Sequence, residues 1–314
     1  MPLPPLLRNR LALPAVAAPM FLVSGPDLVV ETCRAGVVGT FPSLNQRTTQ
    51  GYAEWLGEIS SRLADAPGAA PFGVNLIVHR SNQRVQADLE ATVRHRVPLV
   101  ITSLGAVREV VQAVHGYGGL VFHDVTNIRH AEKAIEAGVD GLIAVCNGAG
   151  GHAGMLNPFA FLTELRAIFQ GTLLLGGAIN TGRQVAAARL MGADLAYIGT
   201  RFVATRESMA PPEYRQMILE AKAKDVIYTS AISGVKGNFL RASIAAAGLD
   251  PDALDESAAR YVSDHESRPW KNIWSAGHGV GGIEDMPTAA ALCARLAGEY
   301  HAAAPPEAAL EAAE

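Results

Sequence analysis

The sequence contains little cysteine, no surplus of basic residues and no long hydrophobic run. Among its 314 residues there are three cysteines, Cys33, Cys146 and Cys293. They are widely spaced, odd in number and without a C-x-x-C pair, which argues against a disulfide framework and against a zinc site. No H-E-x-x-H or other ligand-spaced pair occurs either. We therefore expect a protein of the reducing cytoplasm that binds no metal ion.

The charge balance excludes the usual partners of basic proteins. Lys and Arg number 26 against 30 Asp and Glu, which gives a net charge of -4 and a pI of about 6.1. No Lys/Arg run exceeds a few residues, so neither nucleic acid nor an anionic membrane surface is an expected partner. No uninterrupted apolar run reaches the roughly 18 residues of a transmembrane helix. The expected partner is a small molecule, and the oligomeric state is open, with a homo-oligomer compatible with the sequence.

The apolar stretch at residues 11–23 superficially resembles a secretory signal because two arginines precede it. Pro14 and Pro19 interrupt the stretch, and residues 24–27 then begin a helix. We predict a first β-strand here instead of a signal peptide.

Short apolar strands alternate with helical stretches through the first two thirds of the chain. Glycines at Gly36, Gly138 and Gly192 follow predicted helices and precede strands, the usual place of a helix-stop glycine. Eight such units predict an α/β protein built on a closed (β/α)8 TIM barrel, with an open doubly wound sheet as the alternative. The predicted strands are residues 16–20, 37–40, 72–77, 99–102, 119–125, 141–146, 173–177 and 195–199.

Beyond residue 199 the alternation stops. Residues 200–282 are more polar, mostly helical by pattern and punctuated by glycine and proline. We predict a second, smaller, mainly helical domain at 200–282 that covers the substrate, and a barrel domain formed by 1–199 plus 283–314 with a closing helix at 288–301.

A glycine-rich stretch follows the sixth strand. Residues 147–154 contain four glycines around a single histidine, His152. Glycine lets the backbone approach a ligand closely, and histidine can move protons near neutral pH. The alternative is a flexible surface loop with an incidental histidine.

The loops after strands seven and eight are candidates for phosphate binding. In TIM barrels, ligands lie at the carboxyl ends of the strands, and these two loops commonly hold phosphate. Here they carry Gly176, Gly177, Gly199 and Thr200. The helix beginning near Thr181 would add its positive end. Alternatively, the glycines only permit strand-to-helix turns.

Polar residues occur in other predicted strands. Asn75 needs a buried partner, either a ligand amide or neighbouring backbone. His123 and Asp124 are adjacent in strand five, so at most one faces the barrel interior. For His123 we expect a satisfied core histidine. Cys146 is expected to be a buried structural cysteine and not a nucleophile.

Taken together, these motifs resemble those of the nitronate monooxygenase family, formerly called 2-nitropropane dioxygenases. The resemblance covers nearly the whole chain and depends on the order and spacing of the motifs. They are Ala18-Pro19-Met20, residues 72–75, residues 138–140, residues 149–154, residues 176–179, residues 192–194, residues 199–202 and residues 273–277.

The resemblance implies an FMN-dependent (β/α)8 barrel with a helical domain covering the flavin, and it makes His152 the catalytic histidine. One departure is that some relatives have lysine where this chain has Asp124. The reduction potential of the flavin and the substrate range of those relatives are therefore less directly expected for this chain. The residues implied to contact FMN are Pro19, Met20, Asn75, Gly150, Gly151, Gly176, Gly177, Gly199 and Thr200.

The implied reaction is oxidation of alkyl nitronates or nitroalkanes by molecular oxygen to a carbonyl compound and nitrite. The main alternatives on the same scaffold are an NAD(P)H:quinone reductase and a flavin-dependent enoyl-ACP reductase. An IMP dehydrogenase type is disfavoured because Cys146 precedes the glycines, and a non-catalytic flavin binder would not need His152. Whether Tyr228, Phe239, Trp270 and Trp274 face the flavin is open.

Overall fold

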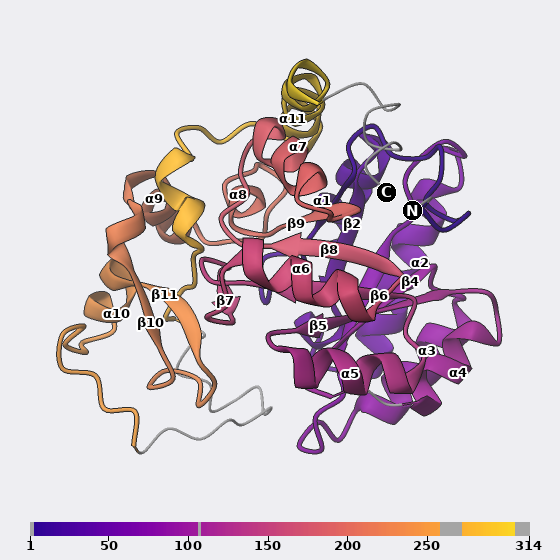
Figure 1. Cartoon of the computed structure of the whole chain (residues 1–314), viewed down its shortest axis with the longest axis horizontal. Helices are drawn as coiled ribbons and strands as arrows, with labels where there is room; N and C mark the ends of the chain where they lie inside the picture. Colours follow the sequence, from indigo (N-terminus) through magenta and orange to yellow (C-terminus); the bar gives the residue numbers. More distant parts are fainter. Residues whose placement is uncertain (1–2, 106–107, 258–271, 305–314) are drawn as a thin grey trace.

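The computed structural model describes residues 3–105, 108–257 and 272–304, and its centre is a closed barrel of eight parallel strands (Figure 1). The predicted α/β class and (β/α)8 TIM barrel are thereby confirmed. β1 pairs with both β2 and β9, which closes the barrel. In order around the barrel, the strands are β1 (Ala15–Ala17), β2 (Val38–Pro42), β3 (Gly73–Ile77), β4 (Leu99–Ser103), β5 (Leu120–Val125), β6 (Gly141–Val145), β8 (Thr172–Gly176) and β9 (Leu195–Ile198).

Helices surround the barrel on its outer side. The glycines expected to stop helices, Gly36, Gly138 and Gly192, have φ values of 76°, 89° and 96°. This left-handed conformation is the one that glycine adopts without steric cost. The outer helices are α1 (Pro26–Arg34), α2 (Thr49–Leu63), α3 (Val85–Arg94), α4 (Arg108–His115), α5 (Ile128–Ala137), α6 (Pro158–Ile168), α7 (Gly182–Leu190) and α11 (Ala289–Ala303), with a short 3₁₀ helix η1 (Ser43–Asn45) after β2.

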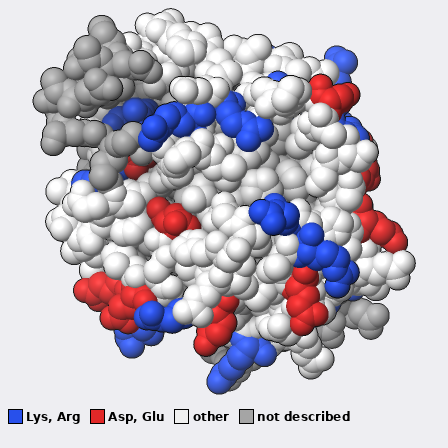
Figure 2. Space-filling model, turned by 90° about the vertical axis from the view of Figure 1, so that its right-hand side faces the viewer, with Lys and Arg blue, Asp and Glu red and all other residues white. Residues whose placement is uncertain are grey.

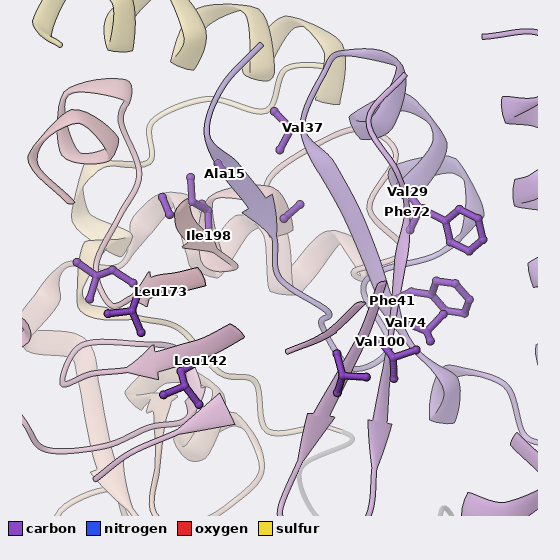
Figure 3. Packing of buried hydrophobic residues seen from close by; sticks show 14 of the residues in the cluster. Ala15, Val29, Val37, Phe41, Phe72, Val74, Val100, Leu142, Leu173 and Ile198 are labelled. Atoms are coloured by element: carbon purple, nitrogen blue, oxygen red, sulfur yellow. The ribbon is translucent and has the colours of Figure 1, made fainter. Parts of the chain in front are cut away.

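The largest hydrophobic cluster fills the layer between strands and helices. Side chains such as Val74, Val100 and Leu142 point outward from β3, β4 and β6 and meet helix residues such as Val29 (Figure 3). The alternate residues of the barrel strands form a separate cluster inside the barrel, including Ile101 on β4, Phe122 on β5 and Leu174 on β8. This alternation of apolar clusters is the period of two that a strand imposes.

Phe122 fills part of the barrel interior where β6 offers no side chain. Its register partner on β6 is Gly141, and a Cβ built on Gly141 would lie 2.5 Å from Phe122 Cδ1. The glycine therefore provides the space that the phenyl ring occupies.

The segment after β9 contains helices and a small antiparallel sheet, drawn in orange beside the barrel in Figure 1. The sequence analysis did not predict this sheet. The strand order is β10-β11-β7; β10 and β11 are only four residues long. The third strand, β7, consists of two residues from the glycine-rich stretch, and its pairing with β11 joins segments that are far apart in the sequence. The elements are α8 (Thr200–Val203), α9 (Pro212–Glu220), η2 (Ala223–Asp225), β10 (Val226–Thr229), β11 (Gly237–Leu240), α10 (Arg241–Ala246), η4 (His278–Gly282) and β7 (Gly151–His152).

The surface shown in Figure 2 carries both acidic and basic side chains among many uncharged residues, and in several places the two kinds lie next to each other. Among the described helices, none has the length and apolar character needed to cross a membrane.

Phe122 provides a test of barrel packing. Phe122 is fully buried and Phe159 on α6 is 70% exposed. We expect Phe122→Ala to lower the free energy of unfolding in urea by about 3–5 kcal/mol, because it leaves a cavity inside the barrel. Phe159→Ala is the matched control and should change it by less than about 0.5 kcal/mol. Similar losses for the two variants would contradict this packing.

Candidate active site

A cavity of about 1010 Å³ lies at the carboxyl ends of the barrel strands. Its walls come from the strand ends and from residues of the segment after β9, including Tyr228, Phe239 and Trp274. Trp270 lies outside the described residues. All ten residues that the sequence analysis assigned to the site line this one cavity, although their individual roles stay predictions: Pro19, Met20, Asn75, Gly150, Gly151, His152, Gly176, Gly177, Gly199 and Thr200.

His152 is held in the cavity wall by strand pairing. It belongs to β7, which pairs antiparallel with β11 through His152↔Gly237 and Gly151↔Asn238. The side-chain amide of Asn238 also donates a 2.7 Å hydrogen bond to the carbonyl of Ala149. The glycine-rich stretch is therefore fixed against the segment after β9, and His152 does not sit in an isolated surface loop.

Close backbone contact explains several glycines here independently of any ligand. A Cβ on Gly237 would lie 2.7 Å from the Gly151 carbonyl oxygen, and one on Gly150 would lie 2.8 Å from the Gly277 nitrogen. Both distances are too short for real side chains. Gly150, Gly237 and Gly277 thus let two chain segments touch directly.

Gly199 differs, because its missing side chain leaves room in the cavity. A Cβ there would meet only Ala18 and Met20, at 3.7 and 3.9 Å. Thr200, the next residue, begins α8, and its hydroxyl accepts a 2.9 Å hydrogen bond from the Gly277 amide. Gly177, on the neighbouring loop, has φ 153°. Two adjacent loops of small residues therefore border the cavity.

The positive end of α7 is partly occupied by contacts within the protein, and its contribution to phosphate binding stays a prediction. The first backbone amide of the helix, at Gly182, donates to the Glu299 carboxylate at 2.7 Å. Thr181 caps the Gln184 amide, and the Gln184 side chain accepts from the Thr181 amide. The end of α7 is thus satisfied within the protein by α11 and by its own cap.

Arg201 follows Thr200 but turns away from the cavity. Its guanidinium donates to the Asp285 carboxylate at 2.6 Å and to the Ala204 carbonyl at 3.3 Å, and the residue is only 3% exposed. Burial lowers the pKa of Arg201, with Asp285 opposing that effect. Arg201 therefore anchors α8 to the chain before α11 and is not positioned as a phosphate ligand.

Three polar side chains form a hydrogen-bonded row across the floor of the cavity. The Asn75 amide donates to Ser103 Oγ at 2.7 Å, and Ser103 Oγ donates to Asp124 Oδ2 at 2.5 Å. They come from β3, β4 and β5. The sequence analysis missed Ser103, although a polar residue two positions after the buried Ile101 on the same strand face could have indicated it.

Asp124 is the titratable member of this row. Within the described part of the chain, its Oδ1 atom is buried and has no hydrogen-bond partner. Burial raises the pKa of Asp124 to about 6, and the Ser103 hydrogen bond opposes that rise. The Asp124 charge also adds to the burial that raises the pKa of Tyr197 on β9.

His123 points to the opposite side of β5, as the alternation requires. Its Nδ1 lies 2.7 Å from Thr102 Oγ1, and its register partner Leu142 belongs to the outer cluster. Burial, helped by the charge of His130, lowers the pKa of His123 to about 4. The expectation of a satisfied core histidine is confirmed.

Cys146 is a buried thiol, as expected. It is 0% exposed, and burial raises its pKa to about 12, which leaves it protonated and unreactive at neutral pH. Across the ranges 3–105, 108–257 and 272–304, no three His, Cys, Asp or Glu side chains cluster as metal ligands do.

The fold and site define a class of protein: a TIM-barrel enzyme with a large ligand cavity at the carboxyl ends of its strands. A family model described as nitronate monooxygenase matches residues 80–296. A nitronate monooxygenase of Paraburkholderia phytofirmans is 30% identical in an alignment 285 residues long that covers 76% of this chain and 76% of that protein. The chain belongs to the nitronate monooxygenase family and is a flavin-dependent oxidoreductase.

Other similar proteins show the breadth of the scaffold. A (3aS,4S,5R,7aS)-5-hydroxy-7a-methyl-1-oxo-octahydro-1H-indene-4-carboxyl-CoA dehydrogenase of Rhodococcus jostii is 28% identical over 233 residues, 74% of this chain and 63% of that protein. The solved nitroalkane oxidase of Streptomyces ansochromogenes has a TM-score of 0.82 at 24% identity, covering 95% of this chain and 99% of its own. FabK from Thermotoga maritima has a TM-score of 0.77 at 21% identity, covering 98% and 97%.

The cavity fits a flavin on features of its own. Its volume accommodates a drug-sized ligand. Gly199 leaves space that a Cβ would fill, and the Asp124 Oδ1 atom is a buried polar group without a protein partner among the described residues. A flavin offers both a phosphate for the loops and polar ring atoms for the floor.

Asp124 makes stability depend on pH. Its folded pKa of about 6 exceeds the ordinary 3.8, so its contribution to stability is greatest below pH 4 and falls as pH rises through 6. In the flavin-free protein, we expect Asp124→Asn to be more stable than wild type by up to about 3 kcal/mol at pH 8, and to lose that advantage near pH 4. Urea unfolding at the two pH values measures this difference. If Asp124→Asn is more stable than wild type by the same amount at both pH values, burial does not destabilise the ionised Asp124 carboxylate.

Proposed function

We propose that the protein oxidises alkyl nitronates with molecular oxygen to a carbonyl compound and nitrite, using FMN. The observation that carries this proposal is that His152 stands in the wall of the same cavity that the β8 and β9 loops border. A side chain suited to proton transfer and the two loops of small residues thus share one cavity.

FMN would be held by residues from several strand ends. Gly176 and Gly177 after β8, with Gly199 and Thr200 after β9, would receive the phosphate through backbone amides. Pro19, Met20 and Asn75 would line the ring, with Gly150 and Gly151 beside it. When bound, the flavin supplies the electron-transfer chemistry, while the protein supplies orientation and electrostatics.

His152 would accept the proton of a neutral nitroalkane, or orient a nitronate by a hydrogen bond. Histidine is suited to both tasks because its unperturbed charge change falls near neutral pH. The pairing of β7 with β11 fixes the backbone of His152, which supports a positioned base.

Apolar and aromatic side chains surround the remaining cavity. Met20, Phe239 and Trp274 line it, and the Trp274 ring stacks on Tyr214 with centroids 5.1 Å apart. The Tyr228 hydroxyl donates to the Ala153 carbonyl at 3.0 Å, which ties this wall to the His152 stretch. Such a wall suits the alkyl part of a small nitronate.

The function is tested by anaerobic mixing. The purified protein, once shown to contain flavin, is mixed separately with propionate 3-nitronate and with NADH or NADPH while the flavin absorbance is followed. We expect a rapid change with the nitronate alone. Rapid bleaching by a nicotinamide alone would instead favour a quinone or enoyl reductase, and a protein that binds no flavin would contradict both functions.

The role of His152 is tested by comparing two substrates. We expect His152→Ala to reduce kcat/KM on neutral nitroethane about 10²–10⁴-fold, because general base catalysis contributes that much. On preformed ethylnitronate, which needs no deprotonation, the loss should be at least tenfold smaller. His301→Ala, at an exposed histidine in the last turn of α11, is the matched control and should leave both rates unchanged. Equal losses on the two substrates would rule out the base role.

A further inference from the structure

The floor of the cavity contains a carboxyl group whose hydrogen bonding is incomplete. Asp124 faces the barrel interior, since its register partner Ile143 belongs to the inner cluster. Its Oδ2 accepts from Ser103, whereas its buried Oδ1 has no donor or acceptor within the described chain. Buried polar groups normally have a partner, so the incomplete one requires an explanation.

The hydrogen-bond row fixes where a proton on this carboxyl group would reside. The Asn75 amide donates to Ser103 Oγ, and the Ser103 hydroxyl donates to Asp124 Oδ2. In this arrangement Oδ2 accepts a hydrogen bond, and a proton on the acid resides on Oδ1. The neutral acid then places no charge on the oxygen that has no donor within the described chain.

We propose that Asp124 is a cofactor-binding residue that contacts the flavin as a neutral carboxylic acid, so that FMN binding takes up one proton from solution at the Asp124 carboxyl group. This inference rests on the proposed function, in which FMN occupies the cavity that Asp124 lines.

Desolvation drives the proton uptake. Asp124 is only half-buried as a residue in the open cavity, although its Oδ1 is covered. A flavin in the cavity would remove the remaining water, and removing water from a carboxyl group disfavours its charged form. The pKa of Asp124 is already raised to about 6 by burial without a flavin, so binding acts in the same direction.

Among the described residues, only the hydrogen bond from Ser103 lowers the pKa of Asp124. No described Lys, Arg or His side chain has that effect. Tyr197 on β9 remains a neutral phenol, since its pKa is raised well above the ordinary value. His123 on β5 faces the outer layer and is neutral above about pH 4. His130 and Lys133 on α5, His152 on β7 and Lys236 before β11 also line the cavity, and burial lowers the pKa of His130. The Ile143 and Val145 side chains of β6 are apolar.

The test is the FMN dissociation constant as a function of pH, followed by quenching of FMN fluorescence between pH 5 and 8.5. We expect the FMN dissociation constant of wild type, divided by that of Asp124→Asn, to rise with pH above about 6 and to reach at least ten by pH 8. Wild type should thus bind FMN more weakly than the variant at high pH. Both proteins share the FMN phosphate and all other titratable groups of the cavity, so the ratio isolates Asp124. Calorimetry at pH 7.5 in two buffers of different ionisation enthalpy should show about one more proton taken up by wild type than by the variant.

Two further variants keep the inference falsifiable. Ser103→Ala removes the hydrogen bond that lowers the pKa of Asp124, so the pH at which FMN binding weakens should move upward. Asp65→Asn removes an exposed carboxyl group on the outer surface and should leave the pH profile of wild type unchanged. If Asp124→Asn fails to fold, the direction of the Ser103→Ala shift decides, and an unshifted profile overturns the inference.

The outcomes separate this inference from the proposed function. If wild type binds no FMN at any pH, the proposed function fails. If wild type and Asp124→Asn bind FMN with the same pH dependence, the inference fails while the proposed function stands. If the affinity of wild type for FMN increases relative to that of the variant as pH rises, the flavin binds the ionised carboxylate. That result also overturns the inference.

Discussion

The site depends on close backbone contact between the stretch after β6 and the segment after β9. Gly237 permits the pairing of β11 with β7, and Gly277 lies against Gly150 where no side chain would fit. These contacts set the backbone position of His152 and close one side of the cavity. A barrel without this segment would keep the strand-end loops and leave the histidine on an unsupported loop. The glycines near His152 are therefore structural requirements, in addition to the FMN contacts proposed for Gly150 and Gly151.

The strand period of two determines the rest of the site. Along β5, Phe122 fills the barrel interior and Asp124, two residues further, faces the same interior at the cavity floor, while His123 joins the outer layer. The same arrangement on β3 and β4 brings Asn75 and Ser103 beside Asp124. The inward-facing side of these strands thus changes from apolar core residues to polar residues of the cavity floor over two residues. The chemistry of the floor is set by which residue each strand places at that level.

Much of this arrangement was predictable from the sequence, because it follows from local patterns. Eight apolar strands, glycines after helices and polar strand ends predicted the barrel and brought ten predicted residues to one cavity. The small sheet was not predictable, since β7 is two residues long and exists only through its pairing with β11. The occupied end of α7 was missed for a similar reason. Glu299, which binds it, is 117 residues away from Gly182 in the chain, and no local pattern reports such a contact.

The central claim is that one cavity holds the flavin between the strand-end phosphate loops and a floor formed by Asn75, Ser103 and Asp124, with His152 in the wall. The most direct measurement is a crystal structure of the protein with FMN. The account predicts the phosphate against Gly177, Gly199 and Thr200, and the flavin ring in contact with both Asp124 and the His152 stretch. A phosphate bound elsewhere, or a flavin ring remote from Asp124 and His152, would contradict it.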